Sequence, residues 1–291
     1  MRRISWLITI ASVLGLPLLA AYWVSGEVGF LLAFPPEWGR VVHVPFNSKW
    51  TLLCILFVSG LPFLWYLTRR RDRIFRHSLV LQRRHFPKWG YLGYLLLAIS
   101  WLVAWNRFEL LSVFQAYTFT PLWLGFILVV NADIHRRSNK APLYKSPGKF
   151  GFLFILSAIF WWVFEYLNRF SENWIYLGVE NVSAAHYYIH GSLCFSTVLP
   201  AVYSVFRWLN CFNSLHRVFY LGPRVPFLKF QSFGILSLGL GLIGMVGVAL
   251  LPPIAYPFVW LGPVLIYGGI RLTLKQGAAL SLWARGDWRW V

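Results

Sequence analysis

Eight long runs of apolar residues divide the chain, and polar segments separate them. The runs cover residues 4–24, 50–68, 90–105, 117–132, 150–167, 187–206, 231–251 and 255–270. A helix needs about 20 mostly apolar residues to cross the hydrocarbon core of a bilayer, where it must satisfy its own backbone hydrogen bonds. The pattern predicts an all-α fold, a single polytopic transmembrane bundle of about eight helices over residues 1–291.

The scarcity of charged residues supports this prediction. Only 12% of the residues are charged and 58% are hydrophobic, whereas a soluble protein has roughly 25% charged residues. So few charged side chains cannot cover a water-facing surface. We therefore expect an integral membrane protein without a separate soluble domain.

Lys and Arg fall mainly in alternate segments between the apolar runs. If the N-terminus is cytoplasmic, all but four of the 27 basic residues lie on the cytoplasmic side, and the exceptions are Arg40, Lys49, Arg107 and Arg169. Positive residues in short loops stay on that side of the membrane. The distribution predicts cytoplasmic N- and C-termini, and we expect the location to be a bacterial inner membrane.

The first run also resembles a secretory signal, because Arg2 and Arg3 precede it and Ala20 and Ala21 lie near its end. The apolar region of such a signal is usually about 7 to 15 residues long. This run is longer, so we expect a retained helix. Cleavage would remove one helix and leave the orientation of the others unchanged.

The net charge of +18 raises the question of a nucleic-acid partner, since basic patches attract phosphate. The basic residues lie between apolar runs, however, and not on one soluble face. We therefore exclude nucleic acid as a partner and expect the cytoplasmic face to bind membrane lipids with anionic headgroups. Residues 69–88 combine arginines with apolar residues, which indicates an amphipathic helix at the membrane surface.

Polar side chains gather at the predicted outer ends of the third to sixth helices. In residues 160–169, Trp161 and Trp162 precede Glu165, Asn168 and Arg169. The last three share a helix face, and an ionisable group at membrane depth is a functional hypothesis by default. We predict catalytic roles for Glu165, Asn168 and His190, and substrate binding by Trp161, Trp162, Arg169, Glu109 and Arg107.

Two carboxylates also have a structural interpretation. Glu165 stands four residues before Arg169, so the two side chains can neutralise each other as an ion pair. Asp133 stands beside Arg136 and Arg137 at the inner end of the fourth run. A charge-neutralised helix end is our preferred interpretation there, and a phosphate or metal site is the alternative.

His186 and His190 are four residues apart, a spacing that places two imidazoles on one helix face for a metal ion. No H-E-x-x-H motif accompanies them, so a metal site would need Glu165, Glu172 or Glu180 from the opposing helix. Histidines that form hydrogen bonds at the membrane interface are the alternative. No motif identifies a cofactor.

The outer segment from residue 25 to residue 49 contains Pro35, Pro36 and Pro45, with Trp38 between them. Prolines stop helices, and tryptophan prefers the headgroup level. We expect this segment to lie on the membrane surface, either as a rigid cap over the bundle or as a lid over a lipid-facing site.

Glycines crowd the last two apolar runs, where Gly234, Gly241 and Gly269 are examples. Small residues allow helix backbones to approach closely in membranes. We expect these two helices to pack together within the chain. A homo-oligomer interface, or contact with another membrane protein, is the alternative use.

Two classes of function fit these observations. The first is a protein that binds, transports or modifies a lipid or isoprenoid-like hydrophobic substrate at the aromatic and polar outer site. The second is a non-catalytic structural or assembly subunit of a membrane complex, in which the aromatic residues form an interfacial belt. The sequence lacks the phosphate-binding loop, nucleophile elbow and selectivity-filter motifs of common ATPases, hydrolases and cation channels.

Overall fold

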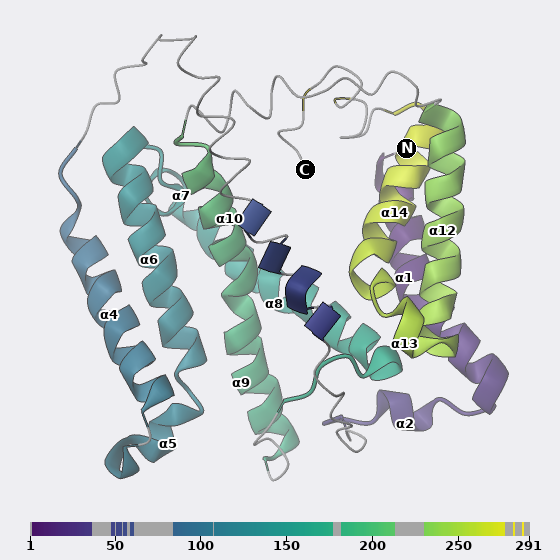
Figure 1. The fold of residues 1–291 in the computed structure, drawn as a ribbon, viewed down its shortest axis with the longest axis horizontal. Coiled ribbons are helices and arrows are strands. Elements are labelled where there is room, and N and C mark those ends of the chain that lie inside the picture. Colours follow the sequence, from purple (N-terminus) through teal and green to yellow (C-terminus); the bar gives the residue numbers. More distant parts are fainter. Residues whose placement is uncertain are drawn as a thin grey trace. The chain divides into compact units, whose positions relative to one another are not determined.

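The computed structural model describes residues 2–36, 48–49, 51–53, 55–56, 59–60, 84–106, 108–176, 182–212, 230–276, 282 and 287 (Figure 1). Helices and no strands occur in these residues. The longer helices are α1 (Arg2–Ser25), α4 (Lys88–Trp105), α6 (Phe119–Ser138), α8 (Pro147–Ser171), α9 (Ala184–Ser196), α10 (Val198–Leu209), α12 (Phe230–Leu250) and α14 (Phe258–Thr273). The short ones are α2 (Gly29–Leu32), η1 (Glu109–Leu111), α5 (Ser112–Gln115), α7 (Pro142–Lys145) and α13 (Pro252–Ala255).

Four helical segments in the described part of the chain are long and apolar enough to cross a membrane. They are α1, α8, α9 continued by α10, and α12. A fifth candidate is α4 followed by η1 and α5, which passes the same test only as a bent pair, while α14 is shorter. The all-helical character is thus confirmed in the described residues, and four of their helical segments are candidate membrane spans. The predicted span at 50–68 lies largely outside the described residues.

Several helices extend beyond the apolar runs or begin later. The helix α6 continues to Ser138, past the predicted end at residue 132. The last helix begins at Phe258 and not at residue 255, because α13 precedes it. Prolines at positions 252, 253 and 257 explain this break, since proline fixes φ and is tolerated mainly in the first turn of a helix.

Backbone contacts divide the chain into two compact units. Unit 1 comprises residues 1–39, 159–192 and 221–291, and unit 2 comprises residues 40–158 and 193–220. The division falls within α8, so the two halves of this helix pack into different cores.

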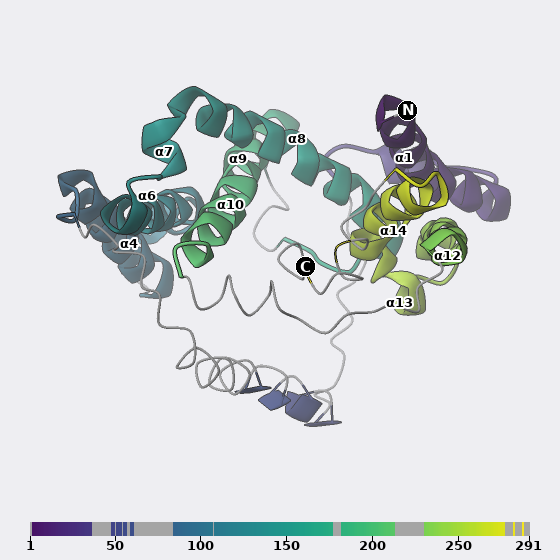
Figure 2. The ribbon, with the colours of Figure 1, turned by 90° about the horizontal axis from the view of Figure 1, so that it is seen from above.

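In unit 1, α12 and α14 pack along their length and α1 lies against both (Figure 2). Glycine makes this packing close: a Cβ atom on Gly269 would lie 2.6 Å from the backbone nitrogen of Leu238. The Ser237 hydroxyl donates a hydrogen bond to the Leu265 carbonyl across the same contact, at 3.0 Å. The predicted packing of these two glycine-rich helices is therefore confirmed. The C-terminal half of α8 contributes Phe164 and Leu167 to the buried core of this unit.

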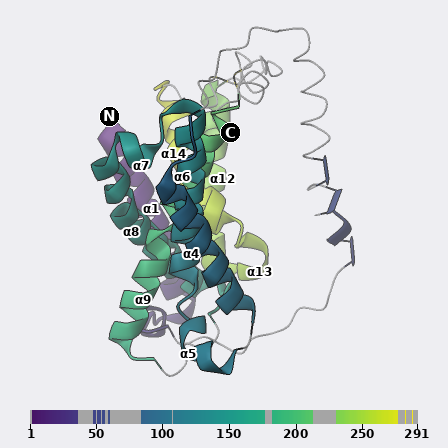
Figure 3. The same ribbon diagram turned by 90° about the vertical axis from the view of Figure 1, so that its left-hand side faces the viewer.

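In unit 2, α4 runs beside α6 (Figure 3), as the backbone contacts also show. The helix α6 also contacts α10. Gly125 permits the first contact, because a Cβ atom there would lie 2.7 Å from the backbone nitrogen of Leu97. The second contact contains a fully buried amide, Asn131, whose Nδ2 donates to the Ser204 hydroxyl at 2.8 Å. Its Oδ1 accepts from the backbone nitrogen of Leu143 at 3.2 Å. A buried amide with specific partners determines which residues of α6 and α10 face each other.

The C-terminal end of α6 carries two ion pairs that share one carboxylate. Asp133 lies 2.5 Å from both Arg136 and Arg137 and accepts a hydrogen bond from the Trp208 indole at 2.7 Å. Burial alone would raise the pKa of Asp133, but the hydrogen bonds from Arg137 and Trp208, together with the arginine charges, hold the pKa below its usual value. The predicted charge-neutralised helix end is confirmed.

Replacing Gly269 by alanine should destabilise the protein by about 1–3 kcal/mol, because the new methyl group overlaps the α12 backbone. Gly268→Ala is the matched control, since nothing lies within 4 Å of a Cβ atom at that position. Because alanine has a higher helix propensity than glycine, Gly268→Ala should leave the stability unchanged or raise it by up to about 1 kcal/mol. Thermal unfolding of both variants in one detergent makes the comparison, and equal midpoints would contradict the close contact between α12 and α14.

Candidate functional site

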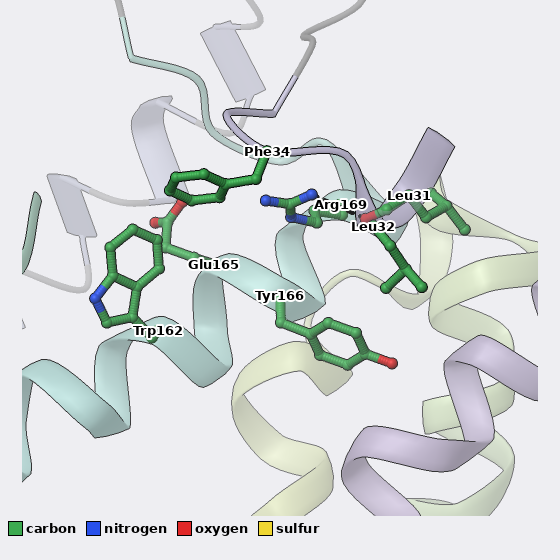
Figure 4. Close-up of a pocket in the computed structure, with 7 residues that line it drawn as sticks. All are labelled: Leu31, Leu32, Phe34, Trp162, Glu165, Tyr166 and Arg169. Atoms are coloured by element: carbon green, nitrogen blue, oxygen red, sulfur yellow. Dashed lines mark hydrogen bonds between the residues drawn. The ribbon is translucent and has the colours of Figure 1, made fainter. Parts of the chain in front are cut away.

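A small pocket lies beside the last two turns of α8 in unit 1 (Figure 4). Its volume is about 220 Å³, and it is lined by Leu31, Leu32, Phe34, Trp162, Glu165, Tyr166 and Arg169. The four α8 residues recur at helical spacing and so share one face of the helix. The other three belong to the end of α2 and the segment that follows it. A carboxylate and a guanidinium are thereby enclosed by apolar and aromatic side chains.

Arg169 holds the segment after α2 against α8. Its Nη1 donates hydrogen bonds to the carbonyl oxygens of Leu31, at 2.9 Å, and of Ala33. The last carbonyls of a helix have no partner within the helix, and a basic side chain is a favourable donor to them. The charge of Arg169 therefore fixes the segment that forms one wall of the pocket.

Asn168 organises the turn that follows α8. Its side chain is fully buried, and Nδ2 donates to the Trp174 carbonyl at 2.6 Å. Its Oδ1 accepts from the backbone nitrogens of Asn173 and Trp174, at 2.9 and 3.3 Å. Glu172 closes the helix with a positive φ of 45°. Asn168, for which we predicted a catalytic role, thus directs its amide to the turn and does not line the pocket.

Two residues of this turn donate hydrogen bonds to the Glu165 carboxylate. The Trp174 indole nitrogen and the Tyr176 hydroxyl donate to the same oxygen, Oε1, at 3.0 and 2.5 Å. Burial, followed by the charge of Glu165, raises the pKa of the Tyr176 phenol, so this group remains a donor at physiological pH. The Glu165 side chain is only 3% exposed. A carboxylate in an apolar environment needs such donors to offset the cost of desolvation.

The predicted ion pair between Glu165 and Arg169 is not formed. Among the described residues, both ion pairs belong to Asp133. Glu165 instead binds the turn after α8, whereas Arg169 binds carbonyl groups of the segment after α2. The two side chains interact only through longer-range electrostatics.

The two predicted binding tryptophans face different surroundings. Trp162 lines the pocket, stacks on Tyr188 with ring centroids 5.4 Å apart, and donates to the Ser192 hydroxyl at 3.0 Å. Phe34 packs against Trp162 with centroids 5.9 Å apart. Trp161 packs instead on Trp260. Of the pair, only Trp162 is placed to contact a ligand in this pocket.

The two histidines of α9 lie on one side of that helix, with ring centroids 5.9 Å apart. No group of three metal-ligating side chains occurs among the residues that the structure describes. Glu180, one of the carboxylates considered as a further ligand, lies outside them. The metal site at His186 and His190 remains a prediction, and His190 does not line the pocket.

The remaining predicted site residues belong to another part of the chain. Glu109 is exposed in η1, within unit 2. Arg107 lies outside the described residues. Trp174 and Tyr176, by contrast, contact Glu165 although the sequence pattern did not indicate them. They stand in an irregular turn, where helical periodicity gives no signal.

No protein-family model matches the chain, and neither curated proteins nor solved structures gave a match. The chemistry of the pocket is therefore the basis for assigning a function.

Asn168→Ala should lower the free energy of unfolding by about 2–3 kcal/mol, because three groups in the turn lose their partner. It should also shift Trp174 fluorescence to longer wavelength as that indole becomes hydrated. Asn173→Ala is the control, since this neighbouring side chain is exposed. Denaturant unfolding and difference spectra against Trp174→Phe test both effects. If the two alanine variants behave alike, Asn168 does not organise the turn.

Proposed function

We propose that this protein binds an amphiphilic lipid or isoprenoid-like molecule at the pocket beside Glu165 and Arg169. The protein would be a multi-pass protein of a bacterial inner membrane with about eight spans and cytoplasmic termini. The pocket would then lie near the outer leaflet, as the charge distribution predicts.

The proposal rests on one observation: two ionisable side chains line a pocket that is otherwise apolar and aromatic. Ligand sites commonly combine an apolar wall with a few convergent polar groups. Ionisable groups at membrane depth are costly and tend to be kept for function. Phe34 and Trp162 supply the aromatic part of this wall.

The size of the pocket limits what it can hold. Sites for small molecules usually enclose roughly 300–1,000 Å³, and this one encloses about 220 Å³. Only the polar end of a lipid fits in that space. The hydrocarbon chain would lie along exposed apolar side chains of the same unit, such as Leu32 and Tyr188.

Binding or transport accounts for the geometry better than catalysis does. Of the three residues for which we predicted catalytic roles, only Glu165 lines the pocket. Asn168 positions the turn that supplies donors to Glu165. Glu165 would then set the charge that the ligand's polar end can carry, because its carboxylate lines the same pocket.

A structural or assembly subunit is the second candidate. The observation that favours it is that Glu165 accepts hydrogen bonds from Trp174 and Tyr176 within the chain. A carboxylate with such partners can serve solely to fix the end of α8. In that case the wide exposed apolar surface would contact another membrane protein or a second copy of the chain.

Anionic headgroups are a further proposed partner, at the inner end of unit 2. Arg136 and Arg137 lie over the rings of Phe86 and Phe212, with the guanidinium carbons 5.9 and 4.7 Å from the ring centroids. Aromatic rings prefer the headgroup level, and cations there attract anionic lipid. This contact is independent of the pocket in unit 1.

Glu165→Gln tests the proposed function, because it keeps the size of the side chain and removes its charge. Native mass spectrometry of wild-type protein, extracted gently from its own membrane, should show a stoichiometric lipid or isoprenoid adduct. The amount of this adduct should change about tenfold in the variant, because the charge beside the ligand's polar end is removed. Glu27→Gln makes the same change at an exposed site of unit 1 and should retain the adduct.

The structural candidate makes the opposite prediction for the same variant. Glu165→Gln would then lower the thermal stability and the yield, while the folded fraction would carry the same lipids as wild type. That outcome would contradict the proposed binding site.

A further inference from the structure

This inference rests on the proposed function and concerns the polar end of the ligand. Arg169 directs only Nη1 to the carbonyls of Leu31 and Ala33. Its Nε and Nη2 have no hydrogen-bond partner among the described residues, although the guanidinium lines the pocket. Nε and Nη2 form one edge of the planar guanidinium, and this edge matches two oxygens of a carboxylate or a phosphate.

Tyr187 supplies a second donor without a partner. Its side chain is 7% exposed, and its hydroxyl is buried with no hydrogen-bond partner in the part of the chain that the structure describes. The phenol interacts electrostatically with both Glu165 and Arg169. Its ring packs on Phe34, with centroids 5.6 Å apart, and on Trp162, at 6.2 Å. The Tyr187 ring therefore packs on two side chains that line the pocket, Phe34 and Trp162.

A buried hydroxyl without a partner is uncommon and costs free energy in proportion to its desolvation. A ligand oxygen at this place would relieve that cost. Arg169 lies in α8 and Tyr187 lies in α9. The geometry of one helix therefore does not explain why donors on both residues lack a hydrogen-bond partner. Figure 4 shows the guanidinium and the Glu165 carboxylate extending to the side of α8 on which Phe34 lies.

We propose that Arg169 and Tyr187 together bind one singly charged oxyanion, a phosphodiester or a carboxylate, at the head of a membrane lipid. The Arg169 edge binds two of the oxygens and the Tyr187 hydroxyl binds one. The hydrocarbon chain leaves the pocket along Phe34 and Trp162.

Glu165 limits the charge of this headgroup. Its carboxylate lines the same pocket as Arg169, and like charges a few ångströms apart repel one another strongly where water is scarce. A phosphomonoester carries about two negative charges above pH 7. A phosphodiester or carboxylate carries one, so the pocket selects it over the monoester.

The test is a titration of purified full-length protein in detergent at about pH 8, where a phosphomonoester is a dianion. Each of the four probes has a long hydrocarbon part, and the probes differ in the charge of the polar headgroup. They are phosphatidylglycerol, oleate, farnesyl phosphate and dioleoylglycerol. The first two should bind about tenfold or more tightly than the last two. Preference between phosphatidylglycerol and oleate identifies the source of the oxyanion.

Substitutions of Arg169 and Tyr187 test which side chains bind the headgroup. Arg169→Gln should weaken binding of the preferred probe by about ten- to a hundredfold, and Arg169→Lys by less, because lysine keeps the charge without the bidentate edge. Tyr187→Phe should weaken binding by about three- to tenfold. The controls Tyr256→Phe and Lys149→Gln remove an exposed phenol and an exposed charge and should bind as wild type does.

The outcomes separate the two proposals. Equal binding of dioleoylglycerol and the anionic probes would overturn the headgroup inference and leave the proposed function standing. Failure of all four probes to bind wild-type protein would overturn both. If the Arg169 variants do not fold, Tyr187→Phe decides alone, since it removes only a hydroxyl without a partner. Unchanged affinity in that variant would overturn the inference.

Discussion

A buried carboxylate must receive hydrogen bonds from the protein or lose the free energy of its hydration, and the local structure around Glu165 follows from this requirement. Trp174 and Tyr176 supply the donors, but both stand in a turn outside the helix. Asn168 fixes that turn through three hydrogen bonds, and it can do so because α8 ends three residues beyond it, at Ser171. The buried acid, the buried amide and the helix end therefore depend on one another.

At the same end of α8, a second set of polar groups has only some of its hydrogen bonds formed within the described residues. Arg169 supports the segment after α2 through one nitrogen, while its other donors and the Tyr187 hydroxyl have no hydrogen-bond partner in the described residues. The Tyr187 hydroxyl matters for the proposed function, because a purely structural network would be expected to satisfy its buried members. Asn168 behaves as a structural group does. The unpaired donors of Arg169 and Tyr187 are the groups on which we base the proposed anion site.

Local sequence patterns were sufficient where the interaction is local. The helical character followed from the apolar runs, the neutralised end of α6 from the spacing of Asp133 and Arg137, and the contact of α12 with α14 from their glycines. Glu165 and Arg169 satisfy the same spacing rule, yet they do not pair, because each finds stronger partners far along the chain or in an irregular turn. Arg169 and Leu31 are separated by more than a hundred residues, and no periodicity predicts such a contact. The short helix α13 and the later start of α14 were missed, because prolines end and restart helices within a segment whose apolar pattern continues.

An experimental structure in a bilayer disc of native lipids tests the central claim, that this pocket is a ligand site, most directly. The account predicts elongated density with its polar end between Arg169 and Tyr187 and its chain along Trp162, with Phe34 moved aside to admit it. An empty pocket, with Phe34 packed on Tyr187 and with the lipids only on the outer surface of the helices, would contradict the claim and favour a structural subunit.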